Sequence, residues 1–358
     1  MRHALLLAAR GLGNVAPNPA VGCVIANGDI VLGHGWTQPG GRPHAETEAL
    51  RQAGAAAKGA TAYVTLEPCA HHGKTPPCAD ALIDAGIRAV FVALTDPDPR
   101  TAGQGIARMR GAGIAVNLGL CEAEAAHLNR GFIATIMRER PWVTLKLATS
   151  SDGMIAWKSG MPRWITGEAS RARVHLMRAR YDTLISGIGT VLADDPAFTC
   201  RLLGLEGCTP QRVIFDRQGR TPVDSKLLGT SDQGEIFIVT TDVGVKNLAP
   251  VQAKLGDDAI KNMGADTDID KVLWDMSKFY ASTRLMVECG TELATAFLDG
   301  DHVDEVAWFR APSVLGDDGI PALAGQSVEQ ALAKGGFEQI KSEKIGQDVL
   351  ETYVKAAY

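Results

Sequence analysis

The sequence predicts an α/β protein built from two domains. Its 358 residues are long for a single hydrophobic core. Short strand patterns alternate with helical patterns along both halves of the chain, which is typical of layered α/β folds. Pro141 ends a helical pattern, and a strand pattern begins directly after it. We therefore predict one domain over residues 1–139 and a second over residues 140–358.

The first half opens with a predicted β-hairpin. Residues 21–25 and 29–35 are strand patterns on either side of Asn27-Gly28, a pair that favours a tight hairpin turn. A helix with an apolar stripe of small residues begins at His44. The other predicted elements of this half are strands at 63–66, 89–94 and 115–118 and helices at 79–85, 105–111 and 122–138.

The second half repeats the alternation. Its predicted strands cover residues 142–147, 183–186, 212–215, 236–240, 285–288 and 306–309, and a helix covers 167–179. No strand is followed by G-x-G-x-x-G, so a dinucleotide fold of the Rossmann kind is not supported. The best phosphate cradle is the glycine turn at 290–293, whose backbone N–H groups could hold a pyrophosphate where a helix opens.

Composition excludes several classes of function. With 46% hydrophobic and 22% charged residues the chain is globular, and its apolar runs are too short to span a membrane. We expect a cytoplasmic protein, since no signal peptide is present at the start and seven cysteines suit a reducing compartment. A net charge of −5 argues against a nucleic-acid partner and favours a small-molecule substrate.

Two short segments carry a metal signature. His44-Ala45-Glu46 is followed by Cys69 and Cys78. One imidazole and two thiolates make three ligands for a tetrahedral Zn²⁺ and leave a fourth position for water. Glu46 is too close to His44 to be a comfortable fourth ligand, so we predict that it is the catalytic proton carrier. We expect one zinc per chain; the alternative is an incidental histidine with two packed thiols.

The spacing of the two cysteines departs from the general signature of zinc deaminases. The general signature is H-x-E followed by P-C-x-x-C, whereas eight residues separate Cys69 from Cys78. A nucleic-acid deaminase would share the zinc ligands, but it predicts the short spacing and a basic groove. The remaining thiols show no ligand spacing and are interpreted as ordinary cysteines, with Cys23 in the core: Cys23, Cys121, Cys200, Cys208 and Cys289.

The first half resembles the deaminase part of a family of bifunctional riboflavin-biosynthesis enzymes, the diaminohydroxyphosphoribosylaminopyrimidine deaminase/5-amino-6-(5-phosphoribosylamino)uracil reductases. The motifs that carry the resemblance are Asn18-Pro19-Ala20-Val21-Gly22-Cys23-Val24, His44-Ala45-Glu46, the run from Pro68 to Cys78, and Asp96-Pro97-Asp98-Pro99. The long cysteine spacing is this family's own form.

This resemblance implies a cytidine-deaminase-like, three-layer α/β/α fold for residues 1–139. It also implies zinc-dependent hydrolytic deamination of 2,5-diamino-6-(5-phosphoribosylamino)pyrimidin-4-one. Asn18, His71 and Lys74 are then assigned to the substrate. His71 and the neighbouring His72 are alternatively loop residues satisfied by solvent.

The second half resembles the reductase part of the same family. The motifs occur in family order: Lys146-Leu147-Ala148-Thr149-Ser150-Ser151-Asp152-Gly153, Trp164-Ile165-Thr166, Gly189 to Pro196, and Glu288-Cys289-Gly290. The resemblance implies a dihydrofolate-reductase-like α/β fold and NADPH-dependent reduction of the ribosyl group of 5-amino-6-(5-phosphoribosylamino)uracil to ribityl. It assigns to the cofactor Ala148, Trp164, Thr190, Asp194, Gly290, Thr291, Glu292, Leu293, Ala294, Thr295 and Ala296, and to the substrate Lys146, Arg178, Arg201 and Glu288.

Two departures keep an alternative open for the second half. Pro162 stands where the family usually has a substrate-contacting serine, and Arg217 where a cofactor-contacting serine is common. A deaminase with a degenerate, binding-only reductase domain is therefore the rival interpretation. Arg178 without the resemblance would be a solvated face of a helix. We also expect a homo-oligomer, while the choice of NADPH over NADH is left open by the residues themselves.

Overall fold

The computed structural model describes residues 1–71, 76–99, 101–159 and 164–356. The chain divides into two compact units: Met1–Pro141 with Ser277–Thr283, and Trp142–Met276 with Arg284–Tyr358. Each unit is α/β, which confirms the predicted fold class. Among the helices that can be described, none is long and apolar enough to cross a membrane.

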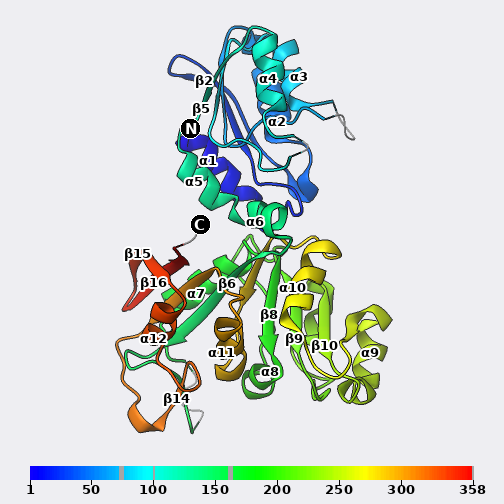
Figure 1. Ribbon diagram of the computed structural model, residues 1–358, viewed down its shortest axis with the longest axis vertical. Helices are drawn as coiled ribbons and strands as arrows, with labels where there is room; N and C mark the ends of the chain where they lie inside the picture. Colours follow the sequence, from blue (N-terminus) through cyan, green and yellow to red (C-terminus); the bar gives the residue numbers. More distant parts are fainter. Residues whose placement is uncertain (72–75, 100, 160–163, 357–358) are drawn as a thin grey trace. The chain divides into compact units, whose positions relative to one another are not determined.

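The first unit is built on a five-stranded mixed sheet with the order β2-β1-β3-β4-β5 (Figure 1). Its strands are β1 (Gly22–Asn27), β2 (Ile30–Trp36), β3 (Thr61–Val64), β4 (Ala89–Val92) and β5 (Ala115–Leu118). Its helices are α1 (Arg2–Ala8), α2 (Ala45–Ala53), α3 (Cys78–Asp84), α4 (Gln104–Gly111), α5 (Glu122–Leu128) and α6 (Arg130–Arg138). The predicted hairpin is confirmed, because β1 and β2 pair antiparallel and Gly28 takes a positive φ of 57° in the turn.

Helices cover both faces of this sheet. Cys23 and Ile25 of β1 pack into one core with α2 and α3, whereas Val24 between them packs against α1. Figure 1 shows α1 and α5 on one side of the strands and α2, α3 and α4 on the other. A Cβ on Gly33 of β2 would lie 2.2 Å from the carbonyl oxygen of Ala49 in α2. Because Gly33 has no Cβ, the backbones of β2 and α2 can lie in close contact, and this packing fixes the position of the residues at the start of α2.

The helix predicted at 122–138 is wrong as one element, because it divides into α5 and α6 at Asn129. Asn129 is buried, and its backbone leaves the helical region at φ −96° and ψ 14°. Its side-chain oxygen accepts a hydrogen bond from the Ala20 N–H at 2.9 Å, and its amide donates to the Ala20 carbonyl at 3.1 Å. The break therefore lets one polar side chain satisfy the buried backbone of a distant segment.

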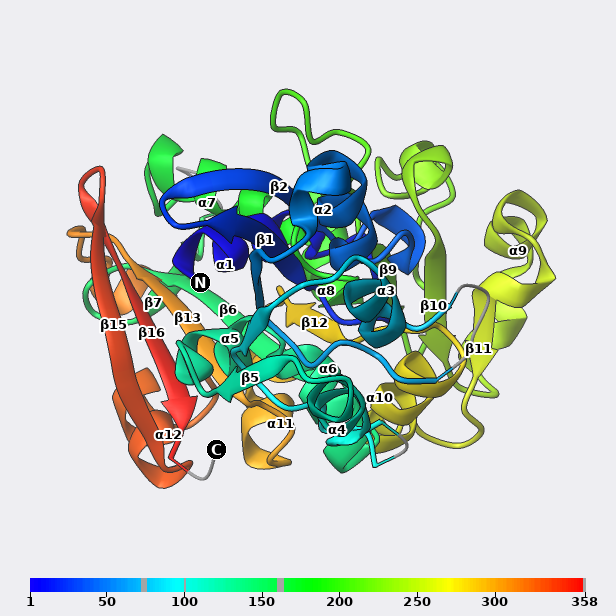
Figure 2. The ribbon, with the colours of Figure 1, turned by 90° about the horizontal axis from the view of Figure 1, so that it is seen from above.

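The second unit is built on a nine-stranded sheet with the order β11-β10-β9-β8-β12-β6-β13-β16-β15. The strands from β11 to β13 run parallel, and β16 pairs antiparallel with both of its neighbours. Figure 2 shows β15 and β16 at one end of the sheet and β10 and β11 at the other. Its strands are β6 (Trp142–Thr149), β8 (Thr183–Gly187), β9 (Gln211–Phe215), β10 (Ile236–Thr240), β11 (Ile260–Asn262), β12 (Arg284–Val287), β13 (Glu305–Arg310), β15 (Phe337–Ile345) and β16 (Asp348–Lys355), and β7 (Met154–Trp157) pairs separately with β14 (Gly319–Pro321).

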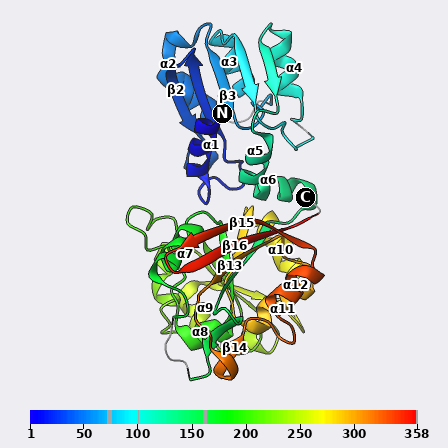
Figure 3. The same ribbon diagram turned by 90° about the vertical axis from the view of Figure 1, so that its left-hand side faces the viewer.

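Helices also cover both faces of the larger sheet. They are α7 (Glu168–Arg178), α8 (Ile188–Asp194), α9 (Ala249–Leu255), α10 (Ile269–Lys278), α11 (Thr291–Asp299) and α12 (Val328–Lys334). Ile188 and Val191 of α8 pack with Leu184 of β8 in the main core. On the opposite face, Phe297 of α11 meets Phe215 of β9 edge to face at 6.4 Å. Figure 3 shows α7 on one side of the strands and α10 and α11 on the other. The carboxyl ends of β6, β8 and β12 therefore lie together at one edge.

Candidate active sites

The first unit brings the three predicted metal ligands together. His44 directly precedes α2, Cys69 lies in the loop after β3, and Cys78 is the first residue of α3. His44 Nδ1 lies 3.3 Å from Cys78 Sγ and 3.7 Å from Cys69 Sγ, and all three ligand atoms lie within 4.8 Å of one another. A tetrahedral zinc with bonds of about 2.3 Å to sulfur and about 2.0 Å to nitrogen would hold these atoms about 3.5 Å apart. The donor set and its spacing therefore fit zinc, and within the described ranges it is the only such cluster of His, Cys, Asp and Glu.

The two thiols share one hydrogen-bonded arrangement. The Cys69 sulfur accepts hydrogen bonds from the Cys78 thiol, from the Cys78 backbone N–H at 3.3 Å and from His44. These bonds lower the pKa of Cys69 to about 4, although burial acts in the opposite direction. Cys69 is thus the thiolate of the pair, and the hydrogen bond that Cys78 donates to it raises the pKa of Cys78 well above its usual value.

Glu46 lies in the first turn of α2, and its side chain is buried beside the ligands. Burial raises its pKa to about 7, while the charge of His44 acts in the opposite direction. A carboxyl group with a pKa near neutral exchanges a proton readily in either direction. The position and the pKa of Glu46 suit proton transfer.

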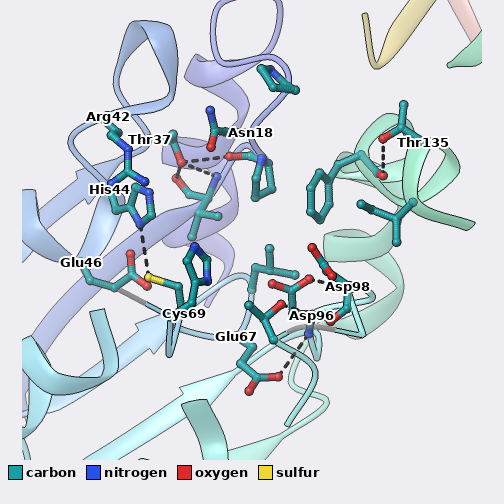
Figure 4. A pocket seen from close by; sticks show the side chains of 18 of the residues that line it. Asn18, Thr37, Arg42, His44, Glu46, Glu67, Cys69, Asp96, Asp98 and Thr135 are labelled. Carbon is teal, nitrogen blue, oxygen red and sulfur yellow. Dashed lines mark hydrogen bonds between the residues drawn. The ribbon is translucent and has the colours of Figure 1, made fainter. Parts of the chain in front are cut away.

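His44, Cys69 and Glu46 line a pocket of about 380 Å³ in the first unit. Figure 4 shows His44, Cys69 and Glu46 on one side of it and Asp96 and Asp98 across from them. The pocket is lined by Pro17, Asn18, Pro19, Val21, Thr37, Arg42, His44, Glu46, Leu66, Glu67, Cys69, His71, Asp96, Asp98, Thr101, Phe132, Thr135, Ile136, Ser277 and Lys278. Two residues assigned to the substrate, Asn18 and His71, are among them.

The place of Asn18 depends on a glycine. Gly41 has a positive φ of 82°, and a Cβ there would lie 1.9 Å from Asn18 Nδ2. Only glycine lets the Asn18 amide pack so closely at the pocket wall. Lys74, the third residue assigned to this substrate, and its neighbour His72 lie outside the described residues.

Several lining residues were missed by sequence reasoning. Asp96 and Asp98 belong to a motif that supported the resemblance, but they had no predicted role; burial raises the pKa of Asp96. Thr37 is buried, accepts a hydrogen bond from the Val21 N–H at 2.9 Å and donates to the Pro19 carbonyl at 3.1 Å. Paired acidic residues directly after a strand were a usable signal, whereas Thr37 had none.

Glu67 anchors the loop that carries the two aspartates. Its buried carboxylate accepts four backbone N–H hydrogen bonds at 2.9 to 3.3 Å, from Asp96, Gly103, Gly105 and Ile106. A Cβ on Gly105 would lie 2.0 Å from the Pro68 carbonyl oxygen, so the start of α4 sits tightly against the segment before Cys69. One carboxylate thus connects the metal-ligand loop to the opposite pocket wall.

A second cluster lies at the carboxyl end of the parallel strands in the second unit. The Glu288 carboxylate, just after β12, accepts hydrogen bonds from Arg178 Nη2 at 2.9 and 3.0 Å and Nε at 3.2 Å. Lys146 Nζ of β6 donates to the same carboxylate at 3.3 Å. Burial alone would raise the pKa of Glu288, but the charges of Arg178 and Lys146 outweigh it and lower the pKa to about 2. Three of the four residues assigned to the reductase substrate therefore form one ion-paired group.

Arg178 also joins this group to the segment that carries Arg201. The Arg178 side chain is buried, so its alternative interpretation as a solvated face is wrong. Its Nη1 donates to the Thr199 carbonyl at 3.2 Å, and His175 Nδ1 lies 3.1 Å from the same oxygen. Burial and the charge of Arg178 lower the pKa of Arg201. Arg201 thus lies within the field of this cluster.

The residues assigned to the cofactor lie mainly at the starts of two helices. Gly290 precedes α11, whose first two turns hold residues 291–296, and Thr190 lies in the first turn of α8. A Cβ on Gly290 would lie 3.8 Å from Thr190 Oγ1, so the two helix starts meet. Asp194 ends α8, Ala148 lies in β6, and Trp164 is exposed with the Arg171 guanidinium 5.3 Å from its ring centre. The start of α11 has no side-chain cap among the described residues, which suits a pyrophosphate on its backbone N–H groups.

The two departures from the family pattern have different outcomes. Arg217 is exposed and pairs with Asp266 at 2.8 Å. Pro162 lies outside the described residues.

Comparison with known proteins gives matches to both halves. Residues 1–94 match the cytidine and deoxycytidylate deaminase zinc-binding region, and residues 141–350 match the RibD C-terminal domain. The riboflavin biosynthesis protein RibD of Aquifex aeolicus is 38% identical and that of Escherichia coli 39% identical, each match covering 98% of this chain and 96% of the relative. The RibD structure of Acinetobacter baumannii superposes with a TM-score of 0.85 at 38% identity, covering 99% of this chain and 97% of that one. A deaminase/reductase of Thermotoga maritima also gives 0.85, at 32% identity and the same coverage.

Proposed function

Because this chain belongs to the RibD family of bifunctional deaminase/reductases of riboflavin biosynthesis, we propose that its two units divide the family's two reactions between them. The first unit would deaminate 2,5-diamino-6-(5-phosphoribosylamino)pyrimidin-4-one. The second would reduce the ribosyl group of 5-amino-6-(5-phosphoribosylamino)uracil, the deaminated product. The observation that carries the proposal is the meeting of His44, Cys69 and Cys78 beside Glu46, at the wall of a pocket that His44, Cys69 and Glu46 line.

In the first unit, His44, Cys69 and Cys78 would hold a single zinc ion. Zinc, when bound, supplies Lewis acidity that makes water a nucleophile near neutral pH. Glu46 would accept a proton from the attacking water and deliver it to the amino group that leaves as ammonia. A pKa of about 7 supports both halves of this transfer. Asn18 and His71 would hold the pyrimidine in the pocket that they line.

In the second unit, we propose that NADPH binds across the starts of α8 and α11, with its pyrophosphate on the N–H groups after Gly290. NADPH, when bound, supplies the hydride for C1′ of the ribosyl group, which opens to a ribityl chain. Lys146, Arg178 and Arg201 exceed Glu288 in charge, and this excess of positive charge suits a ribotide phosphate. Glu288 keeps Arg178 and Lys146 oriented and offers an acceptor to the substrate.

A product assay tests the proposal. Purified protein is incubated with the diaminopyrimidine ribotide, with and without NADPH, and the products are identified by mass. Without NADPH we expect the mass to rise by about 1 Da, because an amino group is replaced by oxygen. With NADPH we expect a further rise of about 2 Da from the added hydride and proton. Deamination with no reduction at any NADPH concentration would support the binding-only rival, and no deamination by zinc-loaded protein would contradict the first assignment.

We also propose that the protein is a cytoplasmic homo-oligomer. Seven free cysteines suit a reducing compartment, and sedimentation analysis of the purified protein tests the oligomeric state.

A further inference from the structure

The second unit contains a buried arginine whose hydrogen bonds to the described residues go to neutral oxygens. Arg212 of β9 has no exposed surface. Its Nη1 donates to Thr230 Oγ1 at 2.8 Å and to the Ala197 carbonyl at 3.3 Å, and its Nη2 donates to the carbonyls of Thr230, at 3.0 Å, and Gly234. Burial lowers its pKa to about 10, while the charge of Asp232 acts in the opposite direction. A buried guanidinium without a directly bonded carboxylate costs folding free energy, which suggests that its hydrogen bonds to these carbonyls have a role in positioning the backbone.

One of those carbonyls belongs to a strained segment. Residues 195–201, which we call the substrate segment, follow α8 and include Thr199 and Arg201. Asp195 has φ 41° and Phe198 has φ 55°, both in the left-handed region that side chains other than glycine rarely adopt. Phe198 is bulky and buried, so its conformation is unfavourable by itself and has to be imposed by contacts.

Contacts hold the substrate segment from two sides. Arg212 binds it at the Ala197 carbonyl, one residue before Phe198. From α7, Arg178 and His175 meet the Thr199 carbonyl, one residue after Phe198, and the Arg178 guanidinium lies 5.7 Å from the Phe198 ring centre. Phe198 is thus held between Arg212 of β9 and Arg178 of α7, the arginine that pairs with Glu288.

We propose that Arg212 is a positioning residue of the reductase. It holds the substrate segment, which carries Arg201, in its strained form beside Arg178. Arg212 is buried and acts through the Ala197 carbonyl instead of touching the ribotide. The inference rests on the proposed assignment of Arg178, Arg201 and Glu288 to the ribotide.

The test compares Arg212→Met and Arg212→Lys in the full-length chain by steady-state reduction of the deaminated ribotide. Met removes all four hydrogen bonds. We expect the KM for the ribotide to rise about tenfold or more while kcat stays within about threefold of wild type, because the ground state and the transition state lose the same binding energy. The KM for NADPH should not change. Lys keeps the charge and part of the bonding, so we expect a KM between those of Met and wild type.

Controls separate positioning from unfolding. Arg220→Met alters an exposed arginine after the same strand and should change nothing. If Arg212→Met fails to bind NADPH, its second unit is unfolded, and His175→Ala then decides the question, since it releases the segment at Thr199 and should raise the KM for the ribotide alone. An unchanged ribotide KM in folded Arg212→Met, or an equal rise in both KM values, would overturn the inference. Failure of wild type to reduce the ribotide would instead overturn the proposed function.

Discussion

Replacing Glu288 by glutamine is expected to destabilise the second unit strongly. Glutamine keeps the shape of the side chain but leaves the positive charges of Arg178 and Lys146 without their buried counter-charge. The pKa of Glu288 lies at about 2 instead of its usual 4.5. At about 1.4 kcal/mol for each pH unit, this difference corresponds to about 3 kcal/mol of folding free energy. Breaking a buried ion pair by removing one partner costs about 3 to 5 kcal/mol in other proteins, which agrees.

The destabilisation should depend on pH with a defined sign. A lowered carboxyl pKa stabilises the folded chain fully above the pKa of the unfolded chain, and the effect is lost as pH falls through the folded value. From the two pKa values, the advantage of wild type over Glu288→Gln should be about 3 kcal/mol at pH 5 and less than half of that at pH 3. The two proteins should therefore become more alike as the solution is acidified.

Urea unfolding followed by tryptophan fluorescence measures this difference. Trp36 is the only one of the six tryptophans in the first unit, so the signal reports mainly the second. In thermal unfolding at neutral pH, the melting temperature of Glu288→Gln should lie about 6 to 12 °C below that of wild type. Glu343→Gln is the matched control, because Glu343 is only partly buried in its pairs with Arg173 and Lys341, and its loss should cost less than about 1 kcal/mol. A loss below about 1 kcal/mol in Glu288→Gln, or a loss that stays constant from pH 5 to pH 3, would refute the ion-pair reasoning.

Other expectations concern the first unit and the separability of the second. Cys69→Ser or Cys78→Ser should lose zinc and deamination together, as measured by elemental analysis and product assay; full zinc retention would show that the ligands are different. Glu46→Gln should retain zinc while deamination falls about 100-fold or more, and loss of zinc would mean that Glu46 coordinates it. Glu67→Gln should destabilise the first unit by about 1.5 to 3 kcal/mol in thermal unfolding, because a charged acceptor of four N–H groups is lost, and should leave reduction intact. A fragment of residues 142–358 should bind NADPH and reduce the ribotide without zinc, since it contains every strand of the nine-stranded sheet, and an unfolded fragment would contradict this expectation.

What the sequence could reveal was local in character. The candidate zinc ligands were visible because two short motifs carry all three donors together with Glu46. The pairing of Arg178 with Glu288 agrees with the family assignment, and parallel strands bring their carboxyl ends to one edge. The candidate metal ligands and the residues at the strand ends could both be predicted because they lie within short motifs or next to strands that the sequence marks.

The residues that escaped sequence reasoning pair with distant backbone. Asn129 binds Ala20, and Glu67 binds the N–H groups around the start of α4, so neither partner is recognisable from its own neighbours. The C-terminal strands escaped for another reason. Most of β15 is exposed on both faces, so its side chains lack the alternation of apolar and polar residues that marks a half-buried strand.

The short segment Ser277–Thr283 changes how the gene could be divided. It is assigned to the first unit although it lies far along the second half of the sequence, so the polypeptide enters the second unit, returns to the first and leaves again. Ser277 and Lys278 line the pocket that we propose for deamination. A deaminase expressed from residues 1–141 alone would lack that piece of wall, and an engineer who wished to express the two activities separately would need to graft it back. Fusion of the two halves is therefore more than tethering by a linker, because residues from both halves of the sequence line the same pocket.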